Sequence, residues 1–183
     1  MPVSADDQRA ISLILILAWT LSGICGGDYL NVGGFVAGVV EKYHVTMTWM
    51  PAIFFLVALL LAFSTGTSWG TFAILLPITV SVFNDEMTSL MVMTTAAVLG
   101  GSVCGDHISP ISDTTILSSA GAECSHINHV ESQMQYGFVV AGVSFVSYLI
   151  AGRIEQQAIG FAIGVIALIL FGLFVKQFDK VKQ

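Results

Sequence analysis

The chain has 183 residues, of which 55% are hydrophobic and only 10% are charged, with a mean hydropathy of +0.86 and a formal net charge of −6. Soluble domains carry about 25% charged residues, so this composition excludes an ordinary soluble domain. It predicts an all-α, polytopic protein with one membrane domain over residues 1–183. The acidic balance argues against nucleic acid as a partner and provides no polybasic patch for lipid headgroups.

The first apolar segment, residues 11–27 (ISLILILAWTLSGICGG), is about long enough to span a membrane. The start MPVSADDQRA is acidic rather than basic, so this segment is predicted to be a retained span and not a cleaved signal. Residues 29–40 (YLNVGGFVAGVV) are too short to span. They are expected to form a half-helix or a helix that lies in the membrane interface.

Residues 50–83 form a long apolar block with the polar centre STGTSWGT, residues 64–71. Each apolar arm has about a dozen residues, or roughly 18–20 Å of helix at 1.5 Å per residue, whereas the hydrocarbon core is about 30 Å thick. Because neither arm is expected to cross alone, the pattern predicts a re-entrant helical hairpin with its polar tip near mid-membrane. The alternative is one long kinked helix whose hydroxyls bond back to its own carbonyls.

Residues 88–121 predict a transmembrane helix that is interrupted in the middle. Gly105 lowers helix preference, and Pro110 lacks an amide hydrogen and disfavours helical angles at the residue before it. The second half-helix is expected to start with Asp113 as its cap. The unwound centre would then hold five polar side chains: Asp106, His107, Ser109, Ser112 and Asp113.

The remainder is expected to contain a polar loop over residues 123–135 and two further spans, 136–151 and 158–175. His126 and His129 stand three apart in that loop, but no third ligand lies near them, and Cys25, Cys104 and Cys124 lack metal-ligand spacing. We therefore expect no bound cofactor. The tail KQFDKVKQ carries three of the six basic residues, which predicts a cytoplasmic C-terminus in a multi-pass protein of the cytoplasmic membrane.

The two polar interruptions carry the chemistry that predicts ion binding. Ionisable groups at membrane depth are costly and usually functional, and hard cations such as Na⁺ prefer oxygen ligands. A carboxyl group in a low dielectric can alternate between a proton and a cation. The two interruptions predict a site that exchanges Na⁺ for H⁺, and they offer nine oxygen-bearing side chains for it: Asp106, Asp113, Ser109, Ser112, Thr114, Ser64, Thr65, Thr67 and Ser68. In the structural alternatives, Asp113 is only a helix cap, Asp106 only bridges backbone, and His107 is a hydrogen-bonded filler and not a proton relay.

One motif suggests a different class of protein. Gly66-Thr67-Ser68-Trp69-Gly70 fits the G-x-S-x-G pattern of the hydrolase nucleophile elbow. That elbow needs a preceding strand, whereas helix-like apolar arms flank this motif. An intramembrane serine hydrolase with His107 as base is therefore the weaker interpretation.

The segments STGTSWGTFAILLPI and GGSVCGDHISPISDTTILSSAG resemble the two signature regions of the NhaC-type Na⁺/H⁺ antiporter family. The order of a hairpin followed by a proline-broken helix is also similar, more remotely, to the C-terminal repeat of divalent-anion/Na⁺ symporters. The resemblance implies an inverted-repeat fold in which each repeat gives one hairpin and one broken helix to the ion sites. By position, the resemblance implies a narrower Na⁺ and H⁺ site, whose six residues match the family's motifs: Asp106, Asp113, Ser112, Thr114, Thr67 and Ser68.

The resemblance implies Na⁺/H⁺ antiport, with organic-anion antiport of the malate/lactate kind as the second transport function. Neither interruption contains Lys or Arg, which favours a cation. Members of that family are more than twice as long as this chain, so it corresponds to a C-terminal half. Its partners would be the lipid bilayer, Na⁺, H⁺ and either a separate N-terminal half or further copies of itself. A non-transporting fragment or assembly subunit is the alternative of another class.

Overall fold

The computed structural model describes residues 46–83 and 87–181, with side chains to residue 173, and isolated earlier positions (16, 20, 24, 29–31, 35, 38 and 42). The predicted elements 11–27 and 29–40 therefore lie outside the continuously described residues. Every regular element in the described ranges is a helix, as the sequence predicts. The elements are η1 (Met47–Trp49), α3 (Met50–Thr65), α4 (Ser68–Val82), α5 (Ser89–Ile108), α6 (Asp113–Gly121), α7 (His126–Ile154) and α8 (Gln157–Val181).

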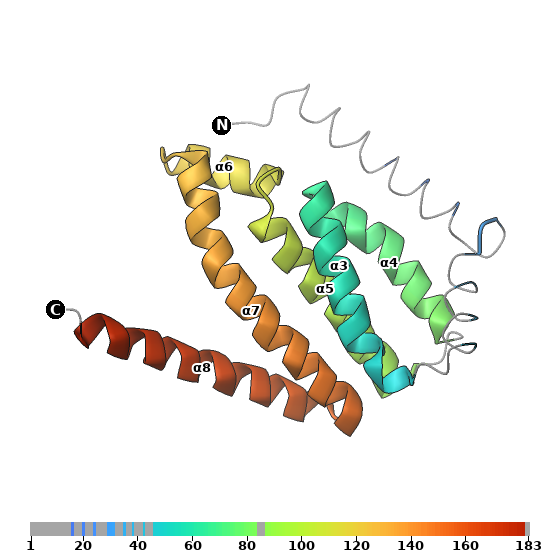
Figure 1. The fold of residues 1–183 in the computed structure, drawn as a ribbon. Coiled ribbons are helices and arrows are strands. Elements are labelled where there is room, and N and C mark those ends of the chain that lie inside the picture. The colour runs from blue at the N-terminus through green and yellow to red at the C-terminus, as the bar shows by residue number, and fades with distance from the viewer. Residues whose placement is uncertain are drawn as a thin grey trace.

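Helices α3 and α4 meet at the polar junction that the sequence predicts. Helix α3 ends at Gly66, whose φ of 67° is left-handed and suits glycine. Thr67 then caps α4 with its side chain. The two helices lie close together in Figure 1 and contact each other, with their junction at one end of the bundle.

The expectation that neither arm of residues 50–83 could cross a membrane is wrong for the first arm. Together with η1, helix α3 forms a stretch of 19 residues, Met47–Thr65, whose mean hydropathy of 2.1 makes it a candidate span. The helix continues through Ser64 and Thr65, whose hydroxyls find acceptors in the carbonyls of Leu60 and Leu61 one turn back. Helix α4 has 15 residues, about 22 Å at 1.5 Å per residue, and remains short of a span. The re-entrant interpretation stays a prediction.

Helices α5 and α6 are separated by a short break at residues 109–112, narrower than the predicted unwound centre. Asp106 and His107 are helical, in the last turn of α5. The helix ends one residue later because Ser109, before Pro110, adopts extended angles of φ −77° and ψ 128°. Helix α5 has 20 residues and is a second candidate span.

The predicted polar loop 123–135 is wrong, because α7 begins at His126. Its 29 residues form the third candidate span of the described chain. The polar residues of its first turns are typical of a loop, but a helix that extends beyond an apolar layer tolerates them. Helix α8 packs chiefly against the end of α7 and diverges from the other helices (Figure 1).

The core of the fold is a parallel pair of helices, α3 and α5. A Cβ on Gly101 would collide with the carbonyl oxygen of Phe55, and one on Gly105 with that of Leu59. The contacts advance along both helices in the same direction, so the helices are parallel. Small residues allow such close approach between helices in lipid, and Ala58 on the α3 side is fully buried.

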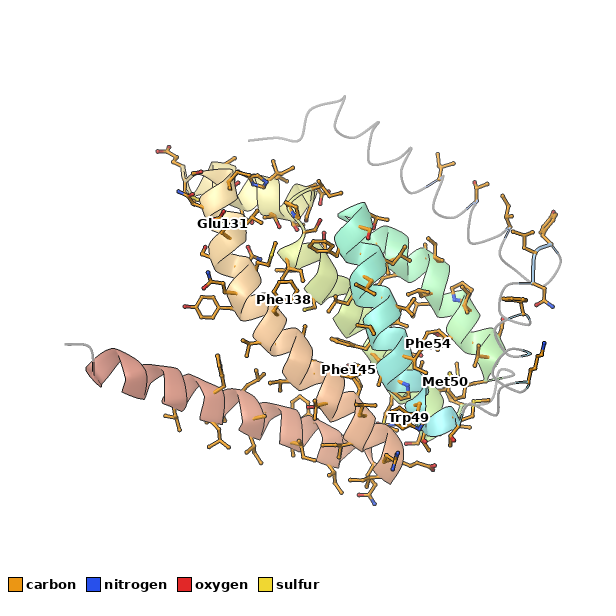
Figure 2. The ribbon with its side chains drawn as sticks, viewed as in Figure 1. Trp49, Met50, Phe54, Glu131, Phe138 and Phe145 are labelled. Atoms are coloured by element: carbon orange, nitrogen blue, oxygen red, sulfur yellow. The ribbon has the colours of Figure 1, made fainter. Side chains whose placement is uncertain are left out.

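Helix α7 packs antiparallel to this pair. Gly137 lies against the side chain of Ile108, at the end of α5, whereas the Tyr148 hydroxyl lies near Gly100, further back along α5. Phe145 joins the cluster formed by α3, α5 and α7 (Figure 2). At the opposite end of α7, the Arg153 guanidinium lies 5.1 Å from the centre of the Trp49 ring. Helices α3 and α5 thus start together at one end and reach their polar junctions at the other.

Candidate ion-binding site

Asp106 is a buried carboxylate in the last turn of α5, with 3% of its surface exposed. The hydroxyl of Ser112, which lies across the break, donates to Asp106 Oδ1 over 2.7 Å. Ser112 is itself fully buried and caps α6 by accepting from the amide of Thr115. The expectation that Asp113 caps this helix is therefore wrong. Ser112 holds the cap position, so that its hydroxyl serves both the helix and the carboxylate.

A second hydroxyl extends this arrangement towards the surface. Thr114 Oγ1 lies 2.7 Å from Ser112 Oγ. Ser112 has one hydroxyl hydrogen and directs it to Asp106, so Thr114 must be the donor to Ser112. Because Thr114 is exposed, a continuous row of hydroxyls connects the surface with the buried carboxylate.

The break is held against the junction of α3 and α4. Ser109, which is fully buried, donates its hydroxyl to the carbonyl of Phe63 over 2.7 Å. A Cβ built on Gly66 would lie 2.8 Å from the carbonyl oxygen of Ile111. The two polar interruptions, more than forty residues apart in sequence, are therefore in direct contact, as expected for parts of one site.

The other predicted residues lie around this centre and not in it. Asp113 is exposed at the start of α6 and accepts from the amide of Thr114 over 2.8 Å. Thr67 caps α4, and Ser68 is the first residue of that helix. His107 is exposed, with Nδ1 2.9 Å from the carbonyl of Val103. Within the described chain, no hydrogen bond joins any of these four to Asp106.

Two further residues shape the site and are not among the six that match the family's motifs. Ser109 is one of the oxygen-bearing residues that the sequence offers, and its hydroxyl ties the break to α3. His126 Nε2 lies 2.8 Å from the carbonyl of Pro110, sixteen residues away. Nothing in the local pattern could reveal that bond, since it depends on α7 beginning at His126 and passing beside the break.

This centre brings together the oxygen atoms of one carboxylate and two hydroxyls, and hard cations prefer oxygen atoms as ligands. In the part of the chain that the structure describes, no group of three or more His, Cys, Asp or Glu side chains could hold a transition metal. Nor does Asp106 form an ion pair with a basic residue described there. Burial of a carboxylate is costly unless a proton or a cation neutralises it.

The hydrolase interpretation does not fit this geometry. Helix α3, and not a strand, precedes Gly66, and Ser68 begins α4. The ring of His107 bonds to its own helix, to the carbonyl of Val103. The strand-to-helix turn that a nucleophile elbow requires is thus missing around Ser68.

Comparison with known proteins identifies the family of this chain. Residues 10–153, most of its length, match the Na⁺/H⁺ antiporter family. The chain belongs to this family. Membership points to a membrane transporter rather than an enzyme and agrees with the three apolar helices that are long enough to span.

Several known proteins are similar in sequence to this chain. An uncharacterized protein of Haemophilus influenzae is 41% identical over 175 residues, which cover 96% of this chain and 33% of that protein. An uncharacterized Na⁺/H⁺ antiporter from the same organism is 33% identical, over 74% of this chain and 29% of its own length. The malate-2H⁺/Na⁺-lactate antiporter of Bacillus subtilis is 26% identical, over 66% of this chain and 27% of its own length. No solved structure matches the chain.

The chain spans about a third or less of the length of these relatives. The resemblance had implied about half of a family member. A C-terminal position within a longer transporter, and the NhaC-type subgroup, stay predictions.

Proposed function

We propose that this chain is part of a secondary transporter that exchanges Na⁺ for H⁺ across the cytoplasmic membrane, with Asp106 as the group that binds both ions in turn. The observation that carries the proposal is the burial of Asp106 at the helix break, with Ser112 as its hydrogen-bond partner. Family membership supports transport in general. The negative charge of the Asp106 carboxylate supports a cation as the transported ion.

The exchange follows from how the buried charge is neutralised. A carboxylate away from water is stabilised by a proton or by a bound cation, and one oxygen cannot serve both at full strength. Na⁺ binding at Asp106 would therefore release the proton, and proton binding would release Na⁺. Ser112 would contribute a second oxygen ligand after turning its hydrogen away from the carboxylate.

The hydroxyl row gives the proton a route. With Asp106 ionised, Thr114 donates to Ser112, and Ser112 donates to Asp106. With Asp106 protonated, its own hydrogen can point to Ser112, and each hydroxyl can reverse its direction. Proton arrival at Thr114 from the surface would thus reach Asp106 without movement of the helices.

Organic-anion exchange is the second candidate, and one feature of the fold favours it. Helices α4 and α6 both begin beside the contact between Gly66 and Ile111. Two helix N-termini would together offer amide donors and partial positive charge to a carboxylate. The Bacillus relative is named as a malate and lactate antiporter. Against an anion, Asp106 is acidic, and residues 64–71 and 100–121 contain no Lys or Arg.

We expect the chain to act together with a further part of the transporter, because it spans about a third of its relatives. The experiment compares membrane vesicles that contain the chain alone with vesicles that contain it and the product of the neighbouring reading frame. Exchange in neither preparation would favour a non-transporting fragment or assembly subunit. Exchange by the chain alone would contradict the expectation that a separate part of the transporter is needed.

The test of Asp106 uses whichever preparation exchanges. Na⁺-dependent collapse of an imposed pH gradient is measured for Asp106→Asn, with the exposed Glu131→Gln as a matched control for loss of an acidic group. We expect Asp106→Asn to abolish exchange and Glu131→Gln to leave it intact. Asp113→Asn should have a smaller effect than Asp106→Asn, since Asp113 is exposed. Undiminished exchange in Asp106→Asn would contradict the proposal. Malate uptake coupled to the pH gradient would favour organic-anion exchange.

A further inference from the structure

His126, the first residue of α7, forms hydrogen bonds through both ring nitrogens. Its Nε2 lies 2.8 Å from the carbonyl oxygen of Pro110, and its Nδ1 lies 3.1 Å from Ser119 Oγ on α6. A carbonyl can only accept, so Nε2 carries a hydrogen and donates to Pro110. One side chain of α7 thus connects the break with the helix that follows it.

The bond to Pro110 supplies a partner that the break itself lacks. Backbone carbonyls outside a helix need donors when they are shielded from water, and Pro110 lies between two helices where no ladder of amides continues. Its neighbours are fixed as well. Ser109 donates to Phe63, and Ile111 packs against Gly66. With His126 on Pro110, three successive residues of the break are each held from outside it, Ser109 and Ile111 by α3 and its end and Pro110 by α7.

The bond persists in either charge state of the ring. Ser119 Oγ also lies 2.9 Å from the carbonyl of Ile116. If Ser119 donates there, Nδ1 must donate to Ser119, which needs the charged ring. If the ring is neutral, Ser119 donates to Nδ1 instead. In both cases Nε2 keeps its hydrogen for Pro110, so the contact with the break does not depend on the proton at Nδ1.

We propose that His126 is a positioning residue for the cation site, which it reaches through the backbone of Pro110. The inference rests on the proposed function of Asp106. Ser112 follows Pro110 by two residues, and its hydroxyl must lie 2.7 Å from Asp106. By fixing the Pro110 carbonyl, His126 sets where Ser112 stands relative to the carboxylate. It touches neither the cation nor the proton.

The test measures the apparent KM for Na⁺ and the maximal exchange rate of two variants at His126. His126→Leu removes both ring bonds, and His126→Gln restores an amide donor for Pro110. We expect His126→Leu to raise the apparent KM by roughly three- to tenfold, the factor that corresponds to one neutral hydrogen bond, with a smaller change in maximal rate. His126→Gln should recover most of the loss.

His129→Leu is the matched control. It removes a histidine one turn further along α7, and the His129 ring makes no hydrogen bond to the break within the described chain. An unchanged KM in His126→Leu would overturn the inference. So would an equal defect in His129→Leu, or a His126→Gln variant as impaired as His126→Leu, because each points to general packing of α7.

A second measurement separates this inference from the proposed function. Amide hydrogen exchange of the peptide that covers residues 109–112 should be faster in His126→Leu than in the parent and in His129→Leu. This readout does not require transport. If Asp106→Asn still exchanges Na⁺ for H⁺ at the full rate, the proposed function fails. Faster amide hydrogen exchange in His126→Leu would still support the contact between His126 and the break. Unchanged amide exchange would overturn the contact itself.

Discussion

Gly66 and Ile111 are in direct backbone contact, and this contact joins the two polar interruptions of the chain. A Cβ on Gly66 would lie 2.8 Å from the Ile111 carbonyl oxygen, and Gly66 has a left-handed φ of 67°. Both facts require glycine. Gly66 therefore has two roles. It ends α3, and its missing side chain lets Ile111 of the break between α5 and α6 come close.

The Gly66→Ala variant tests this contact. The left-handed conformation alone costs a residue with a Cβ about 1–2 kcal/mol, and the new methyl group would also push Ile111 away. We expect a lower melting temperature in detergent and a weaker apparent affinity for Na⁺. Gly121→Ala is the control, since a Cβ there meets nothing within 4 Å. Equal behaviour of the two variants would argue against a functional contact.

Ser112→Ala should separate the cap of α6 from the bond to Asp106. Loss of a capping hydroxyl costs about 1 kcal/mol, and Thr88→Ala removes the comparable cap of α5, where Thr88 accepts from Met91 at the far end of the helix. Ser112→Ala should lose more stability than Thr88→Ala, because it also leaves the buried carboxylate of Asp106 without this hydrogen bond. Only Ser112→Ala should also lose Na⁺/H⁺ exchange, measured as sodium-dependent change of vesicle pH. If the two lose exchange equally, the effect comes from helix stability.

Thr114 is expected to act through its hydroxyl and not through its methyl group. Thr114→Val keeps the shape and removes the donor to Ser112, so exchange should slow by roughly threefold or more, as for the loss of one hydrogen bond. Thr114→Ser keeps the donor and should exchange at nearly the parent rate. Initial rates at several external pH values provide the measurement. A Val variant as fast as the parent would exclude Thr114 from the proton route.

The interface of α3 and α5 should be intolerant of large side chains at Gly105. A leucine there would collide with the backbone of α3, and overpacking typically costs about 1–3 kcal/mol. We expect Gly105→Leu to lower the melting temperature in detergent clearly. Gly142→Ala on α7, where a Cβ meets nothing within 4 Å, should leave it nearly unchanged. A tolerated Gly105→Leu would contradict the close packing of these helices.

The helical class and the places of both interruptions could be predicted from the sequence, the first from the polar run at residues 64–71 and the second from Pro110. The length of each interruption depends on tertiary packing and not on the residues of the interruption alone. Asp106 was assigned to an unwound segment, but the tight packing of Gly105 on α3 keeps this turn of α5 helical. Likewise, Ser112 and not Asp113 caps α6, since Ser112 can serve Asp106 at the same time.

Long-range relationships were beyond prediction from a single sequence. The first turns of α7 are polar, and a polar stretch between two apolar ones is typical of a loop. Their helical form follows from packing beside α6 and the break, including the bond from His126 to Pro110. The contact of Ser109 with Phe63 likewise spans 46 residues. The fold brings such pairs together, and no local pattern contains that information.

The small-residue interface between α3 and α5 has a mechanical consequence for transport. With Gly101 and Gly105 seated on the backbone of α3, neither helix can slide or turn without taking the other along. The α3–α4 junction and the break sit at matching ends of this pair, so the ion would travel inside one rigid body. Under the proposed function, opening to alternate sides of the membrane would leave this helix pair intact and would move other parts of the transporter against it.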